Sequence, residues 1–376
     1  MFVLALSCRD GAVAHNGKCY KLYTEEKTFE EASKTCRSAL GGGHVISIDS
    51  ADVQTFVTSQ MTNESVTYLW MGARMQKTDW RWVHSDSYLK YQGCFKDTNN
   101  SRLDVYIGSS GNYTPDSCIS ECCSRHMIYA GVKLDTTDKT KVVCRCGSRY
   151  HPDMYVNSTA CGEVCPSDSD QKCGHVDLMR IYSVESAGET GWHSNQPNNF
   201  GTTQACLAMH KSFDYKWGDE RCDGGMERYG HVCQYDHDAS ACSQTFAAGK
   251  CYSVHSPTSR EESWYKARYH CKTAGGDLLQ VDTKEIFDFF KNGSALLDQS
   301  VNRWWVGGSR LRWQWSDGED MSFTSWATDR PESESKACAI VGRDVGQGYE
   351  WEDKSCSEQA AFICLQRKSP CSLSST

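Results

Sequence analysis

The chain carries one pattern twice, and the first copy is interrupted. In each copy an aromatic residue, an alanine and a cysteine are spaced three and four apart: Phe29, Ala32 and Cys36, then Trp264, Ala267 and Cys271. In both copies a Trp-x-Gly triplet begins 34 residues after that cysteine. Such self-similarity predicts two related domains. The segment from Tyr91 to Val184 has no counterpart in the second copy, so we expect it to be an insertion.

Cysteine content indicates the compartment. The 376 residues include 22 cysteines, and pairs such as Cys122-Cys123 and Cys144-x-Cys146 are too close for the usual spacing of zinc ligands. In an oxidising compartment so many cysteines form disulfides. Five N-x-Ser/Thr sequons point the same way: Asn63, Asn99, Asn112, Asn157 and Asn292. We therefore expect an extracellular, secreted glycoprotein.

Several function classes are disfavoured. The net charge is −8 and no basic face is evident, which disfavours nucleic acid as a partner. No run of 18 apolar residues predicts a membrane span. No H-E-x-x-H, G-x-S-x-G or P-loop motif indicates an enzyme. Apolar residues 1–6 are either the remnant of a signal peptide or an arbitrary start.

Hydrophobic periodicity predicts an α+β fold. Helices are expected at residues 28–40 and 49–59 in the first copy, and at 261–273 and 283–291 in the second. Short strands are expected at residues 44–48 and 278–281. After the second helix of each copy, alternating tryptophans predict strands: Trp80 and Trp82, then Trp313 and Trp315. Helices followed by short strands are typical of α+β domains.

Both copies resemble C-type lectin-like domains. The matching features are the helix cysteine, the Trp-x-Gly triplet, the last three cysteines, and Trp315-Ser316-Asp317-Gly318, which Trp82-Val83-His84-Ser85-Asp86 follows more loosely. The resemblance implies one disulfide-stapled domain from residues 8–90 and 185–236, and a second from residues 242–367. We call these copy one and copy two.

The resemblance also implies a disulfide framework. In copy one the family's pairing corresponds to Cys8–Cys19, Cys36–Cys233 and Cys206–Cys222. In copy two it corresponds to Cys242–Cys251, Cys271–Cys364 and Cys338–Cys356.

The insertion, residues 91–184, resembles a WSC domain. Its marks are Gly93-Cys94-Phe95, Cys118 and Cys122, Tyr129-Ala130-Gly131, Cys144-Arg145-Cys146-Gly147, Cys161 and Cys165, and Cys173-Gly174. The connectivity of its eight cysteines stays open. A compact module tolerated in a loop has neighbouring ends, so we expect Tyr91 and Val184 to lie close together.

Two cysteines remain, Cys123 and Cys371. They bond each other, or Cys371 bonds a second chain, or Cys123 forms a strained bond with Cys122. The polar, proline-containing tail around Cys371 favours the interchain bond and hence a disulfide-linked homodimer.

One loop of copy one carries candidate Ca²⁺ ligands. In sugar-binding members of the family a Ca²⁺ ion holds two neighbouring sugar hydroxyls, and the matching residues here are Gln196, Asn198, Gln204 and Asp219. Gly218 stands where the family has an asparagine. With one carboxylate, the Ca²⁺ affinity is expected to be on the order of millimolar. Two interpretations stand: a weak Ca²⁺ site that presents a sugar, or a polar loop that kept its shape without a metal. On the first, Gly218→Asn should strengthen Ca²⁺ binding.

The matching positions of copy two carry two cations. Arg330 and Lys336 replace oxygen ligands, while Glu332, Glu352 and Asp353 keep carboxylates. We expect the cations to pair with these carboxylates and exclude Ca²⁺. Copy two is then a surface for a protein, or for a glycan without metal.

Tryptophans invite an interpretation as sugar-stacking residues, but core packing accounts for most of them: Trp70, Trp82, Trp192, Trp217, Trp305, Trp315 and Trp351. Phe200 and Tyr215 beside the loop are better candidates for stacking, and Tyr106, Tyr113 and Tyr150 are candidates in the insertion.

These observations favour a secreted carbohydrate-binding protein, a lectin whose partners are glycans or glycoproteins, with weak Ca²⁺ dependence through copy one. The alternative is a Ca²⁺-independent adhesion or matrix protein that uses lectin-like folds to bind proteins. Gln196, Asn198 and Asp219 favour the first function, and Gly218 and Lys336 favour the second.

Overall fold

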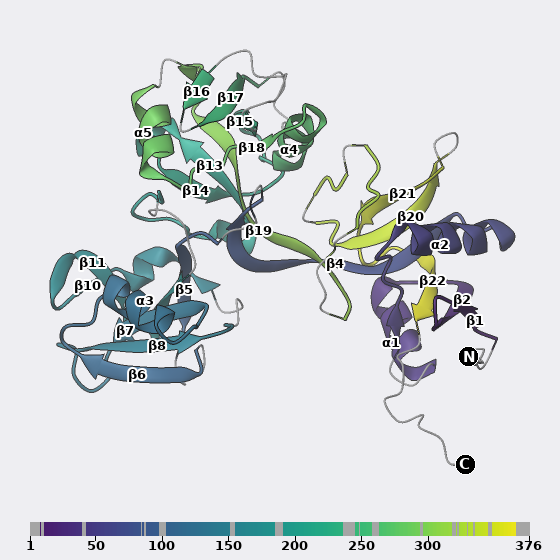
Figure 1. Cartoon of the computed structure of the whole chain (residues 1–376), viewed down its shortest axis with the longest axis horizontal. Helices are drawn as coiled ribbons and strands as arrows, with labels where there is room; N and C mark the ends of the chain where they lie inside the picture. The colour runs from purple at the N-terminus through teal and green to yellow at the C-terminus, as the bar shows by residue number, and fades with distance from the viewer. Residues whose placement is uncertain are drawn as a thin grey trace. The chain divides into compact units, whose positions relative to one another are not determined.

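Contacts divide the chain into two compact units (Figure 1). Unit 1 contains Met1–Gln76 and Arg312–Thr376, and unit 2 contains Lys77–Leu311. Asn99, Cys242 and Cys371 lie outside the described residues. The computed structural model describes residues 8, 11–39, 43–83, 85, 88–97, 103–150, 155–184, 191–235, 245–247, 249–257, 263–293, 296–317, 321, 323–328, 330–333, 335–344 and 348–365.

Unit 1 is an α+β body with two helices beside a mainly antiparallel sheet. Strand β22 pairs antiparallel with β2 and parallel with β4, and β20 pairs antiparallel with β4 and β21. Its elements are β1 Val13–His15, β2 Lys18–Lys27, α1 Phe29–Ala39, β3 His44–Val45, α2 Ala51–Asn63, the start of β4 Tyr68–Trp82, the end of β19 Arg303–Trp315, β20 Cys338–Asp344, β21 Gly348–Lys354 and β22 Ala360–Leu365.

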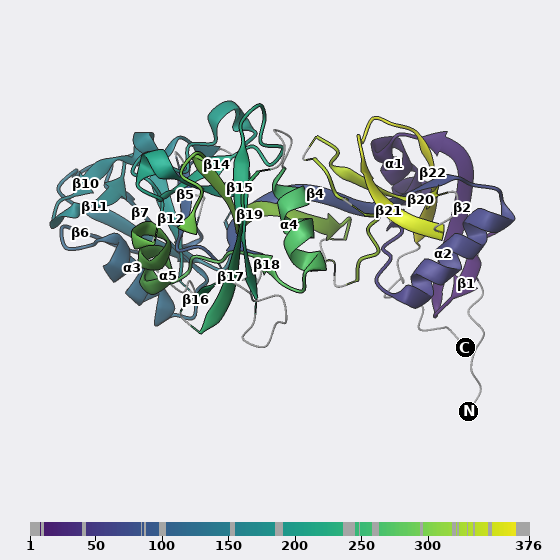
Figure 2. The ribbon, with the colours of Figure 1, turned by 90° about the horizontal axis from the view of Figure 1, so that it is seen from above.

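The same arrangement recurs in unit 2. Strand β15 pairs antiparallel with β17 and parallel with β19, and β13 pairs antiparallel with β19 and β14. Besides parts of β4 and β19, this region contains η2 Phe200–Thr202, β13 Cys206–His210, η3 Lys211–Phe213, β14 Trp217–Glu220, β15 Tyr229–Tyr235, β16 Thr245–Ala247, β17 Lys250–His255, α4 Trp264–Thr273, β18 Asp277–Leu278 and α5 Lys284–Asn292. Both views place α4 beside β15 (Figures 1 and 2).

Local sequence explains where the helices begin. The Thr28 hydroxyl accepts from the Glu31 amide at 3.4 Å, and the Glu31 carboxylate accepts from the Thr28 amide at 3.1 Å, a reciprocal cap for α1. In α4, Ser263 accepts from the Lys266 amide. The expected apolar faces are buried: Phe29, Ala32 and Cys36 in α1, and Trp264, Ala267 and Cys271 in α4. The expected helices are therefore present, with α2 extending to Asn63.

Neither unit is a sequence copy. Unit 1 combines the start of copy one with the end of copy two, and unit 2 combines the rest of copy one, the insertion and the start of copy two. The implied pairs Cys36–Cys233 and Cys271–Cys364 are wrong, because Cys36 is bonded to Cys364 and Cys233 to Cys271. The physical reason is that β4 and β19 are continuous strands of 15 and 13 residues. Each strand has residues in both units, so the chain enters the other unit before it reaches the cysteine that the family's pairing implies.

The local disulfides agree with the family's pairing. Three implied bonds are present: Cys8–Cys19, Cys206–Cys222 and Cys338–Cys356. Cys251 is disulfide-bonded, but its implied partner, Cys242, lies outside the described residues.

The insertion forms a sheet of six strands in the order β6-β8-β7-β12-β5-β9, beside a separate hairpin of β10 and β11. Its ends lie close together as expected, because Tyr91 pairs with Tyr182 and the Ser183 amide donates to the Lys90 carbonyl at 2.9 Å. Its elements are β5 Tyr91–Lys96, β6 Val105–Ser110, α3 Pro115–Cys123, β7 Tyr129–Leu134, β8 Val142–Gly147, β9 Tyr155–Val156, η1 Ser158–Cys161, β10 Glu163–Cys165, β11 Asp168–Gly174 and β12 Leu178–Ser183.

Disulfides hold the insertion's elements together. Cys118–Cys144 and Cys122–Cys146 tie α3 to β8, Cys94–Cys161 ties β5 to η1, and Cys165–Cys173 closes the β10–β11 hairpin. Cys123 is an exposed free thiol, so it is not bonded to Cys122. Over the part of the chain that the structure describes, no helix is both long and apolar enough to cross a bilayer.

Candidate functional site

Asp219 in β14 is the buried centre of the candidate site in copy one. Its side chain is 1% exposed, and its two carboxylate oxygens accept from the amides of Asn198 at 2.7 Å and Asn199 at 2.6 Å. Burial raises the pKa of Asp219 to about 6, although these amides and Arg310 act in the opposite direction. The loop that follows the cis bond between Gln196 and Pro197 is thereby tied to the end of the sheet.

The structure brings the other three predicted ligands to the same loop. Asn198 Oδ1 and Gln204 Oε1 both accept from the Phe200 amide, at 2.9 and 2.6 Å. Gln196 Oε1 is buried without a hydrogen-bond partner, as is Asn199 Oδ1, a residue that sequence reasoning did not single out. A buried oxygen without a partner carries an unfavourable desolvation cost, which a cation or a ligand hydroxyl removes.

This donor set fits a weakly held Ca²⁺ ion. Gln196, Asn198, Gln204 and Asp219 supply hard oxygens from one loop and the adjoining strand, and hard oxygens are the ligands that Ca²⁺ takes. The single carboxylate implies low affinity. Three of the four residues already hold the loop together through hydrogen bonds, so the loop keeps its shape by its own contacts.

Gly218 lies against a stack of three rings. A Cβ atom at this position would lie 3.0 Å from His210 Nε2 and 3.3 Å from the Phe213 ring. The Phe213 ring stacks on His193 at 4.2 Å and on His210 at 4.4 Å between centroids. The place where the family carries an asparagine ligand is thus crowded by side chains that the sequence did not indicate. The expected gain in Ca²⁺ binding from Gly218→Asn therefore requires His210 to move.

The ring stack is anchored by charge. His210 Nε2 lies 3.1 Å from Glu220 Oε1, and Arg303 approaches the same oxygen at 3.7 Å. Burial alone would raise the pKa of Glu220, but His210 and Arg303 hold it below its usual range. Since Glu220 faces these two groups, its charge is committed to them and not to the candidate ligands.

The insertion supports the loop from its other side. The Tyr155 hydroxyl donates to the Pro197 carbonyl at 2.8 Å, and the Ser158 amide reaches the same carbonyl at 3.4 Å. The Arg310 guanidinium lies 5.0 Å from the centre of the Tyr155 ring. These contacts join the insertion to the candidate site, and no sequence motif indicated them.

The matching loop of copy two is closed by ion pairs. The Asp353 carboxylate is buried and accepts from the amides of Glu332 at 3.0 Å and Ser333 at 3.2 Å. The Arg330 guanidinium lies 2.8 Å from Glu332 and 3.3 Å from Asp353, and Lys336 also pairs with Glu332. The expected pairing of both cations with the carboxylates is confirmed. A guanidinium therefore stands among the residues that match the Ca²⁺ ligands.

Exposure separates the aromatic candidates. Phe200 is 80% exposed, whereas Tyr215 is 8% exposed and so offers no face to a ligand. In the insertion Tyr106 is exposed and Tyr150 is buried. The expectation that the tryptophans serve the core is confirmed, since all seven are buried: Trp70, Trp82, Trp192, Trp217, Trp305, Trp315 and Trp351.

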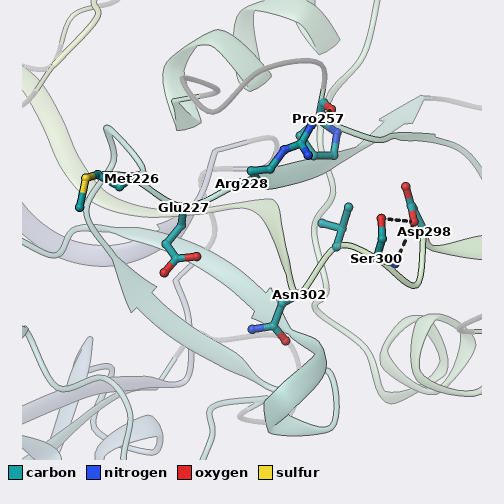
Figure 3. A pocket seen from close by; sticks show the side chains of 8 residues that line it. Met226, Glu227, Arg228, Pro257, Asp298, Ser300 and Asn302 are labelled. Atoms are coloured by element: carbon teal, nitrogen blue, oxygen red, sulfur yellow. Dashed lines mark hydrogen bonds between the residues drawn. The ribbon is translucent and has the colours of Figure 1, made fainter.

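A separate pocket of about 390 Å³ opens on unit 2 (Figure 3). Glu227, Arg228 and Asp298 line it, and none of the four candidate ligands does. Asp298 accepts from Ser300 at 2.7 Å, and Glu227 lies 3.4 Å from Arg303. The two acids are thus already paired with neighbours, and the pocket is a polar depression distinct from the loop site.

Family comparisons agree with this architecture. The model of the lectin C-type domain matches residues 25–126 and 260–366, more than half of the chain, and that of the WSC domain matches residues 91–175. The human C-type mannose receptor 2 is 21% identical over 443 aligned residues, which cover 96% of this chain and 29% of the receptor. The chain therefore spans less than a third of the length of that relative.

Shorter relatives match a smaller part of the chain. Snaclec 3 of Sistrurus catenatus edwardsii is 29% identical over 121 residues, covering 28% of this chain and 80% of the snaclec. The crystal structure of human lithostathine aligns over 96% of this chain and 92% of its own at 9% identity, with a TM-score of 0.31.

Proposed function

The chain belongs to the C-type lectin domain family and has a WSC domain inserted in its first copy; on this premise we propose that it is a glycan-binding protein whose glycan site is the loop of copy one. The observation that carries the proposal is that this loop is bonded to the buried Asp219 carboxylate while Gln196 Oε1, in the same loop, is buried without a hydrogen-bond partner. A glycan hydroxyl or a cation satisfies that oxygen.

Gln196, Asn198, Gln204 and Asp219 are the residues that would hold Ca²⁺. The bound ion would supply coordination to two neighbouring sugar hydroxyls. The chain's own residues do the rest: the amides of Asn198 and Asn199 fix Asp219, and Tyr155 fixes Pro197. Phe200 is exposed beside this loop and offers a face to an apolar side of a sugar ring.

Affinity chromatography tests the proposal. The full chain is applied to immobilised mannose, galactose and N-acetylglucosamine in millimolar CaCl₂ or in EDTA. We expect retention on at least one sugar that is lost in EDTA and lost in Gln196→Ala. Gln171→Ala, which changes a glutamine in the insertion's hairpin, is the matched control and should be retained. Retention that neither EDTA nor Gln196→Ala reduces would place the glycan site elsewhere.

A second function rests on copy two. Its loop is closed by Arg330 and Lys336 without need of a metal, which supports binding of a protein or glycan independently of Ca²⁺. We expect such binding to persist in EDTA. Reversing the charges with Arg330→Glu and Lys336→Glu should abolish this Ca²⁺-independent binding. Unchanged binding in the double variant would show that the copy-two loop is not the binding surface.

Extracellular location and a binding role without catalysis belong to the same proposal. The disulfides of both units require an oxidising compartment. Four sequon asparagines are exposed and suited to N-glycosylation: Asn63, Asn112, Asn157 and Asn292. Secretion from cultured cells should yield protein whose mass falls on treatment with an N-glycosidase, and an unchanged mass would argue against glycosylation.

We also propose the interchain Cys371 bond as the basis of a homodimer. Cys123, the other spare cysteine, is an exposed free thiol and is not bonded to Cys371 within the chain. This supports a bond between Cys371 and a second chain. A dimer would raise the avidity of weak sites. Non-reducing electrophoresis should show a dimer band for the wild type and Cys123→Ser but not for Cys371→Ser; a monomer band for the wild type would remove the proposal.

A further inference from the structure

Three histidines from three elements of unit 2 meet beside the Cys233–Cys271 bond. His231 of β15 lies opposite His255 of β17 in the antiparallel register, and their rings stack at 4.8 Å between centroids. His270 of α4 approaches edge-on, with its ring centre 4.5 Å from that of His255. His231 Nε2 lies 2.8 Å from His270 Nδ1. One nitrogen from each ring falls within 4.8 Å of the others.

These nitrogens have the chemistry of metal ligands. Two imidazoles bound to one Zn²⁺ at about 2.0–2.1 Å hold their nitrogens roughly 3 Å apart. A neutral imidazole keeps a lone pair for coordination on its unprotonated nitrogen. Cys233 also lies in the group, but its sulfur is bonded to Cys271 and is not a thiolate.

One of the three rings, that of His255, has a hydrogen-bond partner of the kind that orients a metal-binding histidine. His255 Nε2 lies 2.7 Å from Ser253 Oγ, which lies 3.0 Å from the Tyr235 hydroxyl. If Nε2 carries the proton and donates to Ser253, then Nδ1 is the nitrogen left to coordinate. Ligating histidines usually donate their other N–H in this way. His231 is buried, His255 is half-buried and His270 is exposed, so one side is open to solvent for entry of an ion.

The same positions in unit 1 show that the fold does not require histidine there. Tyr23 pairs with Phe362 in the register where His255 pairs with His231, and the two rings stack at 4.9 Å. Thr35 precedes Cys36 as His270 precedes Cys271. An ordinary aromatic pair therefore fills this place in one unit, while three nitrogen donors fill it in the other.

We propose that His231, His255 and His270 form a site for a divalent transition-metal ion such as Zn²⁺, with solvent completing the coordination. His231 belongs to copy one in the sequence, and His255 and His270 belong to copy two. The ion therefore joins the two halves from which unit 2 is built, next to the disulfide that joins them covalently. Because the unfolded chain does not bring the three rings together, binding stabilises the folded unit.

Calorimetric titration of the untagged full chain with ZnCl₂ tests this site. We expect one equivalent of Zn²⁺ per chain, the same Zn²⁺ isotherm when millimolar CaCl₂ is present, and a rise in the melting temperature of several degrees at saturating Zn²⁺. His270→Thr, which installs the residue of unit 1 at an exposed position, should lower the affinity about 10-fold or more.

Two further variants separate coordination from packing. The double change His231→Phe and His255→Tyr copies the stack of unit 1; it should keep the fold by circular dichroism and lose the Zn²⁺ isotherm. His126→Asn removes an exposed histidine of the insertion and should change nothing. The absence of a Zn²⁺ isotherm in the wild type, or an unchanged isotherm in His270→Thr, would overturn the proposal and leave the 2.8 Å contact as an imidazole–imidazole hydrogen bond.

Discussion

Asp219 and Asp353 occupy matching positions in the two copies and show how one neighbour changes a site. Both are buried, and each accepts two backbone amides from the loop that follows a cis-proline bond. The difference lies at the residue before the proline, which is Gln196 in copy one and Arg330 in copy two. A neutral amide leaves room for a cation beside the carboxylate, whereas the guanidinium is itself the cation.

Exchanging these neighbours should transfer Ca²⁺ sensitivity. The double variant Arg330→Gln and Lys336→Gln installs the residues of copy one. Without metal it should be destabilised by about 2–4 kcal/mol, because Asp353 and Glu332 lose their partners. Millimolar CaCl₂ should restore part of that loss, since three carboxylates then face the loop. Thermal melts in CaCl₂ and in EDTA measure this, with Lys336→Gln alone, which keeps Arg330, as the control. Identical melting temperatures of the double variant in CaCl₂ and in EDTA would contradict the predicted gain of Ca²⁺ sensitivity.

Gly218 gives a second prediction at the scale of one residue. Gly218→Asn should destabilise unit 2 by about 1–3 kcal/mol, because the new side chain meets His210 and Phe213 in a packed stack. Gly225→Asn is the control: Gly225 has open space around it and a φ of +60° that asparagine tolerates, so its effect should be small. Denaturant unfolding measures both. Unchanged stability of Gly218→Asn with tighter Ca²⁺ binding would show that the ring stack yields to the metal.

Among the elements, α4 depends on a buried charge in β18. Asp277 is fully buried, with Arg268 at 3.1 Å and Lys272 at 3.0 Å, both from α4. Burial alone would raise the pKa of Asp277, but these two cations outweigh it and hold the pKa below its usual range. The ionised carboxylate thus fastens the helix to the strand that follows it.

Stability of unit 2 should therefore fall in acid. A carboxyl group with a depressed folded pKa contributes stability above its unfolded pKa of about 4, and this is lost as the pH falls through the folded value. Asp277→Asn should cost roughly 2–4 kcal/mol at pH 7, less than a fully buried pair because both cations are partly exposed. It should also flatten the decline between pH 5 and pH 2. Lys272→Gln, at a half-exposed partner, should cost much less. If the free energy of unfolding fell equally in acid for the wild type and for Asp277→Asn, groups other than Asp277 would be responsible for the loss of stability.

At the scale of the whole molecule, the main finding is that each unit is built from halves of both copies. The corresponding pairings are the same in both units: β22 with β2 and β4 in one, β15 with β17 and β19 in the other. Since each half meets an equivalent partner, the exchange keeps these strand pairings of the repeated fold. It also makes each unit depend on segments from both copies.

Disulfide mapping tests the exchange directly. Digestion of the non-reduced chain at acid pH, followed by mass spectrometry, should yield peptides linked by Cys36–Cys364 and by Cys233–Cys271. The local bond Cys206–Cys222 is present in either arrangement and serves as the internal control. Recovery of Cys36–Cys233 in place of Cys36–Cys364 would show that each copy closes on itself in solution.

Much of the architecture follows from local sequence. The helices and their buried faces depend on residues close together along the chain, and the short-range disulfides were implied by the family resemblance; the structure agrees with both. The ion pairs of Arg330 and Lys336 were also predictable, because they follow from charge at matched positions. The two domain types were indicated by the family resemblance, which rests on short motifs of the same kind.

Only the tertiary structure decided that the start of copy one folds with the end of copy two, and the end of copy one with the start of copy two. The two copies carry the same helix cysteine and the same spacing to the Trp-x-Gly triplet, so the sequence pattern is satisfied equally by closure within a copy and by exchange. The choice depends on β4 and β19 each contributing residues to both units, which is a property of long-range packing. The support of Pro197 by Tyr155, the ring stack at Gly218 and the meeting of His231 with His255 and His270 depend in the same way on segments distant in the chain.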